Sequence, residues 1–151
     1  MIIYIEYGQA IEIHHKTIEK SGGGSCSSIN IGYLESALEH IKNDDYYPTF
    51  EDKLTHLIWS INKNHAFSDG NKRLSITLGL QFLSLNGYLY CIKRFLFEME
   101  NISYHLAARN IDKELLKDLI HSFLENEDDF NEELKFRLLL AIGNNDIDIE
   151  N

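Results

Sequence analysis

The residues that could do chemistry lie together in one stretch, Asn64–Arg73 (NHAFSDGNKR). His65 offers an imidazole that can act as a general base near neutral pH. Asp69 offers a carboxylate of the kind that holds Mg²⁺ beside phosphates. Gly70 lets the backbone come close to an anion, and Asn71 can donate a hydrogen bond to a phosphate oxygen.

Lys72 and Arg73 fall in the first turn of a predicted helix that begins near Gly70 or Asn71. The start of a helix presents unpaired N–H groups and the positive end of its dipole, which together favour anions. Cations at this end oppose the dipole, so helix stability does not explain them, whereas phosphate binding does. From residue types alone, two interpretations stay open: transfer of a phosphorus-containing group to a hydroxyl, or a structural loop with an incidental histidine.

Two predicted helices position this stretch. The helix before it has apolar residues at i, i+4, i+7, i+8 and i+11, which are Phe50, Leu54, Leu57, Ile58 and Ile61. Thr49 and Asp52 form a variant capping box at its start. The helix after it, residues 71–85, is apolar on nearly every face and stops at Asn86-Gly87, which predicts a central helix. Gly79 within it predicts the close approach of another helix, because glycine there costs about 1 kcal/mol relative to alanine.

The rest of the chain is also mostly helical in pattern, so the predicted fold class is all-α. Further helices are expected through about residue 20 and over 33–41, 97–109, 113–124 and 131–142. Residues 1–7 and 88–97 stay ambiguous: the first could be a short strand or begin a helix, the second a short strand or an extended connection. Residues 125–129 are interpreted as a solvated connector, and residues 144–151 as a frayed acidic tail. His14 and His15 are interpreted as solvent-facing, since no partner is spaced to share a metal with them.

Length, charge and cysteine content limit the classes of protein. The 151 residues suit one domain, divided here into a main unit at 1–124 and an acidic helix and tail at 125–151. Residues 125–151 hold nine acidic residues against two basic ones, out of a net charge of −10 for the chain. No basic face is expected, so nucleic acid is disfavoured as a partner. There is no membrane-spanning run or signal peptide, and Cys26 and Cys91 form no metal or disulfide pattern, which together predict a cytoplasmic protein.

A glycine-rich stretch precedes the second predicted helix. Gly22, Gly23 and Gly24 lie in the sequence SGGGSCSS, which lacks the Gly-Lys-Ser/Thr ending of a phosphate-binding P-loop. Its composition is typical of a loop within the domain rather than of a domain boundary. Two interpretations stay open from composition alone: a plain linker, or a flap over a site.

The sequence HAFSDGNKR resembles the signature of the Fic/Doc superfamily, H-x-F-x-(D/E)-(G/A)-N-(G/K)-R. Lys72 in the penultimate place resembles the death-on-curing (Doc) branch. The GG and YLESAL segments near residues 22–38 and FLSLNGY at 82–88 are similar to further motifs of that branch, in the same order. The resemblance covers roughly residues 4–124.

The resemblance implies a small helical fold and a role for each residue of the signature. His65 would be the general base that activates a hydroxyl of a target protein, and Asp69 would hold Mg²⁺. Gly70 and Asn71 would form an anion hole, while Lys72 and Arg73 would bind the phosphates of ATP. The glycines at 22–24 lie where the family has a flap that positions the target segment by strand addition, which favours the flap interpretation.

Two reactions are known in the superfamily, AMP transfer by Fic proteins and phosphorylation of a translation elongation factor by Doc. The usual Fic pattern has glycine at the place of Lys72 and a second arginine at the place of Ile76. Both departures favour a Doc-like kinase that modifies a Ser or Thr hydroxyl, with AMP transfer kept as the alternative. In Cys26–Asn30 the chain lacks the charged residues common in Doc-like relatives, which leaves flap behaviour and target choice open.

The resemblance also implies partners. The chain lacks the self-inhibitory Ser/Thr-x-x-x-Glu-Gly/Asn motif of many Fic proteins, so restraint would come from a separate antitoxin protein. The sequence therefore predicts the toxin of a toxin–antitoxin pair that uses ATP and Mg²⁺. A catalytically silent module that binds a nucleotide or a partner is the alternative from another class. The sequence names neither the target nor the oligomeric state.

Overall fold

The protein folds as a stack of helices, which confirms the predicted all-α class. The structure is a computed structural model that describes residues 1–20, 31–64 and 69–150. No strand occurs in these described ranges. Their elements are α1 (Tyr7–Lys20), α2 (Ile31–His40), α3 (Phe50–Asn64), α4 (Asp69–Leu85), the short 3₁₀ turn η2 (Leu89–Cys91), α5 (Ile92–Ala107), α6 (Lys113–Leu124) and α7 (Glu132–Glu150).

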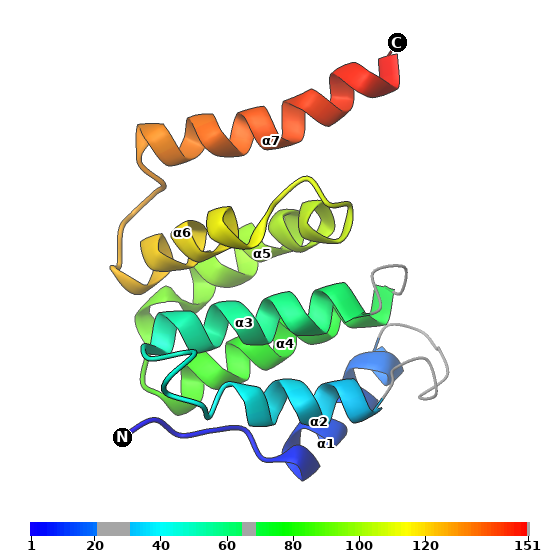
Figure 1. Cartoon of the computed structure of the whole chain (residues 1–151), viewed down its shortest axis with the longest axis vertical. Helices are drawn as coiled ribbons and strands as arrows, with labels where there is room; N and C mark the ends of the chain where they lie inside the picture. The colour runs from blue at the N-terminus through cyan, green and yellow to red at the C-terminus, as the bar shows by residue number, and fades with distance from the viewer. Residues whose placement is uncertain (21–30, 65–68, 151) are drawn as a thin grey trace.

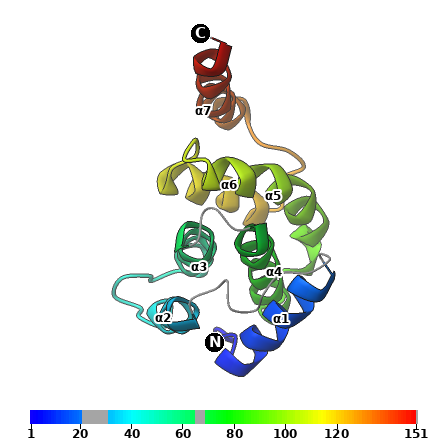
Figure 2. The ribbon, with the colours of Figure 1, turned by 90° about the vertical axis from the view of Figure 1, so that its right-hand side faces the viewer.

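The helices pack in layers around α3 and α4. These two helices lie side by side in both views, α1 and α2 cover one side of the pair, and α5 and α6 cover the other (Figures 1 and 2). α7 lies beyond α6, at the end of the molecule. No helix within the described ranges is both long enough and apolar enough to cross a lipid bilayer.

The core runs through the middle pair, as the sequence predicts. Leu57 and Ile58 of α3 and Leu74, Leu78 and Phe82 of α4 are completely buried. Because α4 has α3, α1 and α5 as neighbours, apolar residues are needed on most of its faces. The prediction of a central helix is confirmed.

The predicted ends of these two helices are confirmed as well. Asp52 N–H donates to Thr49 Oγ1 at 3.1 Å, and Thr49 N–H donates to Asp52 Oδ2 at 3.3 Å, which is a reciprocal capping box. α4 ends at Leu85, two residues before Gly87, whose φ of +83° favours glycine. The chain therefore enters α3 and leaves α4 at positions that local side chains determine.

Gly79 lies where two other helices meet α4, so the predicted close approach is confirmed. A Cβ atom at this position would lie 2.9 Å from Phe95 Cζ of α5 and 3.0 Å from Ile58 Cδ1 of α3. Both neighbours are completely buried and have little room to move. Glycine at this point lets α3, α4 and α5 pack closely.

We expect Gly79→Ala to lower the free energy of unfolding by about 1–2 kcal/mol, because overpacking outweighs the gain of about 1 kcal/mol in helix propensity. Gly143→Ala in α7 is the matched control. Apart from its chain neighbours and the backbone of α7 itself, no described atom would lie within 4 Å of its new Cβ, so it should be neutral or slightly stabilising. Urea unfolding followed by circular dichroism measures both. A Gly79→Ala protein as stable as Gly143→Ala would contradict the close packing.

The N-terminal segment differs from both interpretations offered for it. Residues 1–6 form neither strand nor helix, and α1 begins at Tyr7. Ile3 is instead held by the side chain of Asn86, which accepts from Ile3 N–H at 2.8 Å and donates to Ile3 C=O at 2.9 Å. The side-chain amide of Asn86 thus satisfies both backbone groups of Ile3, as a neighbouring strand would.

The strand or extended connection expected at Tyr88–Phe97 is wrong. A 3₁₀ turn occupies Leu89–Cys91, and α5 begins at Ile92, five residues before the expected start. The buried residues of α5 are Phe95, Met99, Ile102, Ser103 and Leu106. Phe95 is the first residue of this helical stripe, so the helix must begin before it.

His14 does not face solvent, contrary to the interpretation of the sequence. It is 2% exposed and lies four residues after the buried Ala10, on the inward side of α1, whereas His15 next to it is exposed. Residues i and i+4 share a face of a helix, so packing of Ala10 also places His14 inside. Cys91 is buried as well, and burial raises the pKa of its thiol. Cys26 lies outside the described residues.

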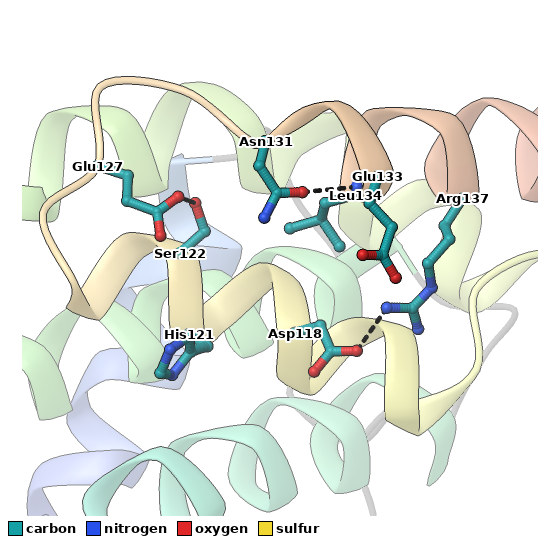
Figure 3. A pocket seen from close by; sticks show the side chains of 8 residues that line it. All are labelled: Asp118, His121, Ser122, Glu127, Asn131, Glu133, Leu134 and Arg137. Atoms are coloured by element: carbon teal, nitrogen blue, oxygen red, sulfur yellow. Dashed lines mark hydrogen bonds and ion pairs between the residues drawn. The ribbon is translucent and has the colours of Figure 1, made fainter.

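The C-terminal region is more helical than expected. Residues 125–129 are an exposed connector, as predicted, but α7 continues to Glu150 where a frayed tail was expected from residue 144. Gly143 interrupts the helical pattern of the sequence, but no proline follows it, and α7 continues beyond it. α7 is held on α6 by buried Leu134 and by an ion pair of 2.6 Å between Arg137 Nη1 and Asp118 Oδ2 (Figure 3).

Candidate functional site

The first turn of α4 forms the described part of the candidate site. α3 ends at Asn64 and α4 begins at Asp69, within two residues of the predicted start at Gly70 or Asn71. The first four N–H groups of an α-helix have no partner within the helix, and the helix dipole is positive at this end. The start of α4 is therefore a kind of position that favours an anion.

Asn71 lies inside the molecule at this terminus. It is 1% exposed, so its amide is sheltered from bulk water. Gly70 beside it is half-buried. Hydrogen bonds and charge interactions are stronger where water is excluded, so a phosphate group at this terminus would be held more firmly than at an open surface.

Lys72 and Arg73 line a pocket between α4 and α5. The pocket has a volume of about 380 Å³, and its walls are Lys72, Arg73 and Ile76 of α4 with Leu96, Glu100, Ser103 and Tyr104 of α5. Lys72 Nζ lies 5.4 Å from the centre of the Tyr104 ring, within the range of a cation–π interaction. Arg73 is exposed. The volume lies in the range usual for sites that bind small molecules.

The two cations have one carboxylate among their pocket neighbours, that of Glu100. The described wall therefore carries a net positive charge, with apolar surface from Ile76 and Leu96 next to it. Such a lining suits a ligand that is anionic at one end and apolar at the other. A nucleotide is a ligand of this kind.

The first turn of α4 is fixed by its own side chains. Ser75 Oγ donates to Lys72 C=O at 2.7 Å, and Thr77 Oγ1 donates to Arg73 C=O at 2.8 Å. Leu74, directly after Arg73, is completely buried between the helices. The backbone that carries the two cations is therefore held in place.

The end of α3 is tied to the same helix that supplies the far wall of the pocket. Asn62 Nδ2 donates to Ser103 C=O of α5 at 3.1 Å, and Lys63 Nζ donates to Leu106 C=O at 2.5 Å. Burial, with Arg109 nearby, lowers the pKa of Lys63. The end of α3 is thus anchored against α5, the helix that also contacts Lys72 of α4 through Tyr104.

Sequence reasoning missed the contribution of α5. Leu96, Glu100, Ser103 and Tyr104 are spaced i, i+4, i+7 and i+8, so they share one face of the helix. This pattern is present in the sequence beside the buried stripe. It could have been recognised as a second functional face, but nothing in the sequence indicates that this face lies against Lys72.

The structure brings together four of the predicted site residues: Gly70, Asn71, Lys72 and Arg73 lie in one helical turn. His65 lies outside the described residues, as do Gly22, Gly23 and Gly24. Asp69 begins α4, and its side chain is outside the description. Among the residues that are described, no group of three or more His, Cys, Asp or Glu side chains has the geometry of a metal site.

Comparison with known proteins gives two matches. A model of the Fic/DOC family matches residues 4–83. A curated protein named Toxin Doc, from Mycolicibacterium smegmatis, is 30% identical over 94 residues, which are 60% of this chain and 72% of that protein. No solved structure matches the chain. The family match ends within α4, so it includes the whole turn that carries Gly70–Arg73.

Proposed function

Because the chain belongs to the Fic/DOC family, on its Doc-like branch, we propose that it is a Doc-like toxin that phosphorylates a protein. The reaction is the transfer of the γ-phosphate of ATP, with Mg²⁺, to a Ser or Thr hydroxyl of a target of the translation-factor class. One observation carries the proposal. Lys72 and Arg73 lie in the first turn of α4, within the family signature, and both line a pocket large enough for a small molecule.

The residues present suit a nucleotide with its metal. The start of α4 supplies backbone donors, and Lys72 and Arg73 supply two positive charges for phosphates. Tyr104 and Leu96 supply apolar surface on the opposite wall. Mg²⁺ is commonly bound by one or two carboxylates together with substrate phosphates, so Asp69 alone from the protein would suffice. The ion would neutralise charge that develops on the transferred group.

The remaining roles in the proposed reaction belong to residues of the motif and of the glycine-rich stretch. His65 would accept the proton of the target hydroxyl as that oxygen attacks the γ-phosphorus, and the bond from this phosphorus to the bridging oxygen would break to release ADP. Gly70 N–H and the Asn71 amide would bind the phosphate oxygens, on which negative charge accumulates during transfer. Gly22–Gly24 would form the flap that holds the target segment next to His65.

Ile76 supports phosphoryl transfer over AMP transfer. It lies on the pocket wall next to Lys72 and Arg73, at the place where the Fic pattern has its second arginine. An apolar side chain there supplies no charge for a further phosphate group. The pocket is thus suited to fewer phosphate contacts than a Fic site, which favours a different placement of ATP and a Doc-like reaction.

Labelled ATP tests which group is transferred. The purified chain is incubated with a cell extract, Mg²⁺ and ATP that carries label on either the α- or the γ-phosphate. Label on protein from the γ-position alone is expected, and chelation of Mg²⁺ should abolish it. Label from the α-position would instead establish AMP transfer. No label from either position would contradict the enzyme and favour the silent binding module.

The biological setting follows from the same proposal. The chain would act in the cytoplasm, and a separate antitoxin protein would hold it inactive. Expression without that partner is then expected to arrest growth, and the arrest should require the ability to transfer phosphate. Normal growth during expression of the folded protein would contradict a toxin and leave a binding role.

A further inference from the structure

A second pocket lies at the opposite end of α3 from the motif. It has a volume of about 350 Å³ and lies between the start of α6 and the segment that leads into α3. Its lining residues are Tyr46, Tyr47, Asp52, Thr55, Lys113, Glu114 and Lys117. Thr55 lies nine residues before the end of α3, a distance of about 14 Å along a helix axis. The pocket is therefore separate from the candidate transfer site.

Thr55 is a buried hydroxyl group without a partner in this pocket. It is 2% exposed, and its Oγ1 makes no hydrogen bond to any residue that the structure describes. Most buried polar side-chain atoms in folded proteins are hydrogen-bonded, because an unsatisfied one is costly. A ligand oxygen in the pocket would satisfy this hydroxyl.

Lys113 is a cation of this pocket that forms no ion pair with the residues that the structure describes, although the charge of Asp52 acts on it from farther away. Its Nζ lies 3.0 Å from His56 Nδ1 and 5.6 Å from the centre of the Tyr47 ring. Burial, together with Lys113 and His40, lowers the pKa of His56 to about 4, so this imidazole is neutral at neutral pH and accepts at Nδ1. No carboxylate in the described ranges forms an ion pair with Lys113. Its remaining N–H groups are available to an acceptor in the pocket.

The two carboxylates that line the pocket, those of Asp52 and Glu114, do not pair with Lys113. Lys117 Nζ forms an ion pair of 2.7 Å with Asp52 Oδ1, and Asp52 also accepts from Thr49 Oγ1 at 2.8 Å. Asp52 is thus paired with Lys117 of α6 and with Thr49 before α3. Glu114 lines the pocket and is exposed to solvent, where water screens its charge.

The environment of Lys113 is fixed rather than loose. His56 Nε2 lies 3.2 Å from Tyr47 Oη and 3.1 Å from Ser60 Oγ, and the His56 and Tyr47 rings stack with centres 4.3 Å apart. Lys113 Nζ thereby donates a hydrogen bond to a fixed His56 ring and lies near the face of the Tyr47 ring. A preorganised cation and a buried, unsatisfied hydroxyl that line the same pocket suit the binding of a polar ligand.

We propose that this pocket binds the oxyanion group, carboxylate or phosphate, of a small ligand. Lys113 and Thr55 Oγ1 donate to that group, and the apolar part of the ligand lies against the rings of Tyr46 and Tyr47. The site lies apart from the signature and holds whether or not the transfer reaction is the one proposed above.

Direct titration of the full-length chain tests this site. The probes are benzoate and phenyl phosphate, which place a carboxylate or a phosphate on one apolar ring, with benzyl alcohol as the neutral control. Saturable binding of at least one of the two anions is expected, seen as a shift of the His56 ring signals by NMR, and no shift with benzyl alcohol. Comparing the two anions identifies the headgroup. Failure of both anions to bind would overturn the proposal.

Two variants of nearly the same shape separate the site from general charge effects. Lys113→Met and Thr55→Val are each expected to weaken anion binding about tenfold or more, because each removes a hydrogen bond to a charged group. Lys135→Met, at an exposed lysine of α7, is the control and should bind as the original chain does. Circular dichroism checks that each variant is folded. Unchanged affinity in either folded pocket variant would also overturn the proposal.

Discussion

Replacing His65 by alanine is expected to slow phosphate transfer to the target by about 10²–10⁴-fold, the usual contribution of a positioned general base. The substitution removes the only predicted proton acceptor of the signature and leaves Gly70–Arg73 unchanged. The initial rate of label transfer from γ-labelled ATP, at saturating nucleotide, measures the effect. Affinity for ATP should change little, since the phosphates are assigned to the start of α4.

His15→Ala is the matched control for this substitution. His15 is an exposed histidine on α1, in the first layer of the molecule, and has no role in the proposed reaction. It should transfer phosphate at the original rate. In cells, His65→Ala is expected to relieve the growth arrest and His15→Ala to retain it. A His65→Ala protein that keeps more than half of the original rate would contradict the role of a general base.

The middle of the fold could be predicted because its signals are local. The regular spacing in α3, the Thr49–Asp52 capping box and the Asn86-Gly87 stop each depend on neighbouring residues, and all are confirmed. Even Gly79 indicated a close approach, because a glycine in a helix needs a reason. Which helices approach it is a tertiary fact. The sequence contains no sign that Phe95 and Ile58 are those neighbours.

The errors arise where packing outweighs local pattern. His14 is polar, yet it shares a helix face with Ala10, and the contact of α1 with α4 buries that face. The predicted start of α5 is five residues too late, because Lys93 and Arg94 obscure the stripe that begins at Phe95. Arg94 is accommodated by donating from Nη1 to Ser122 C=O at 3.2 Å and Glu127 C=O at 2.9 Å. Long-range partners of this kind are not visible in a single sequence.

The candidate site divides in the same way. The signature predicts that Gly70, Asn71, Lys72 and Arg73 share the start of a helix, and the structure confirms it. The opposite wall of the pocket, from Leu96 to Tyr104, depends on how α5 lies against α4, which no local pattern sets. The roles of His65, Asp69 and Gly22–Gly24 stay predictions.

The largest effect on stability is expected at Phe82, in the centre of α4. Phe82→Ala should lower the free energy of unfolding by about 3–5 kcal/mol, the range for deleting a buried phenylalanine side chain. The ring is completely buried, and its centre lies 4.8 Å from that of Phe50 and 6.2 Å from that of Tyr4. It joins α4, α3 and the N-terminal segment, so the surroundings cannot close the cavity without moving two other elements.

Phe97→Ala on α5 removes the same ring from a position that is 78% exposed, and it should change stability by about 0.5 kcal/mol or less. Urea unfolding of both variants gives the difference directly. Since a domain of this size is stable by about 5–15 kcal/mol, the loss at Phe82 is a large part of the total. Similar unfolding midpoints for the two variants would contradict the central position of Phe82.

The substitution at Phe82 should affect stability and leave the transfer rate of the folded protein unchanged, whereas the substitution at His65 should do the reverse. Phe82 lies nine residues after Arg73, about 14 Å along α4, so its removal leaves the first turn of the helix in place while the protein is folded. Phe82→Ala is then expected to keep the transfer rate per folded molecule at low temperature and to lose it on mild heating. His65→Ala should unfold at the original midpoint and transfer slowly at every temperature. α4 carries core residues and the two cations of the candidate site. The comparison therefore tests whether the C-terminal part of α4 contributes mainly to stability and its first turn mainly to the reaction.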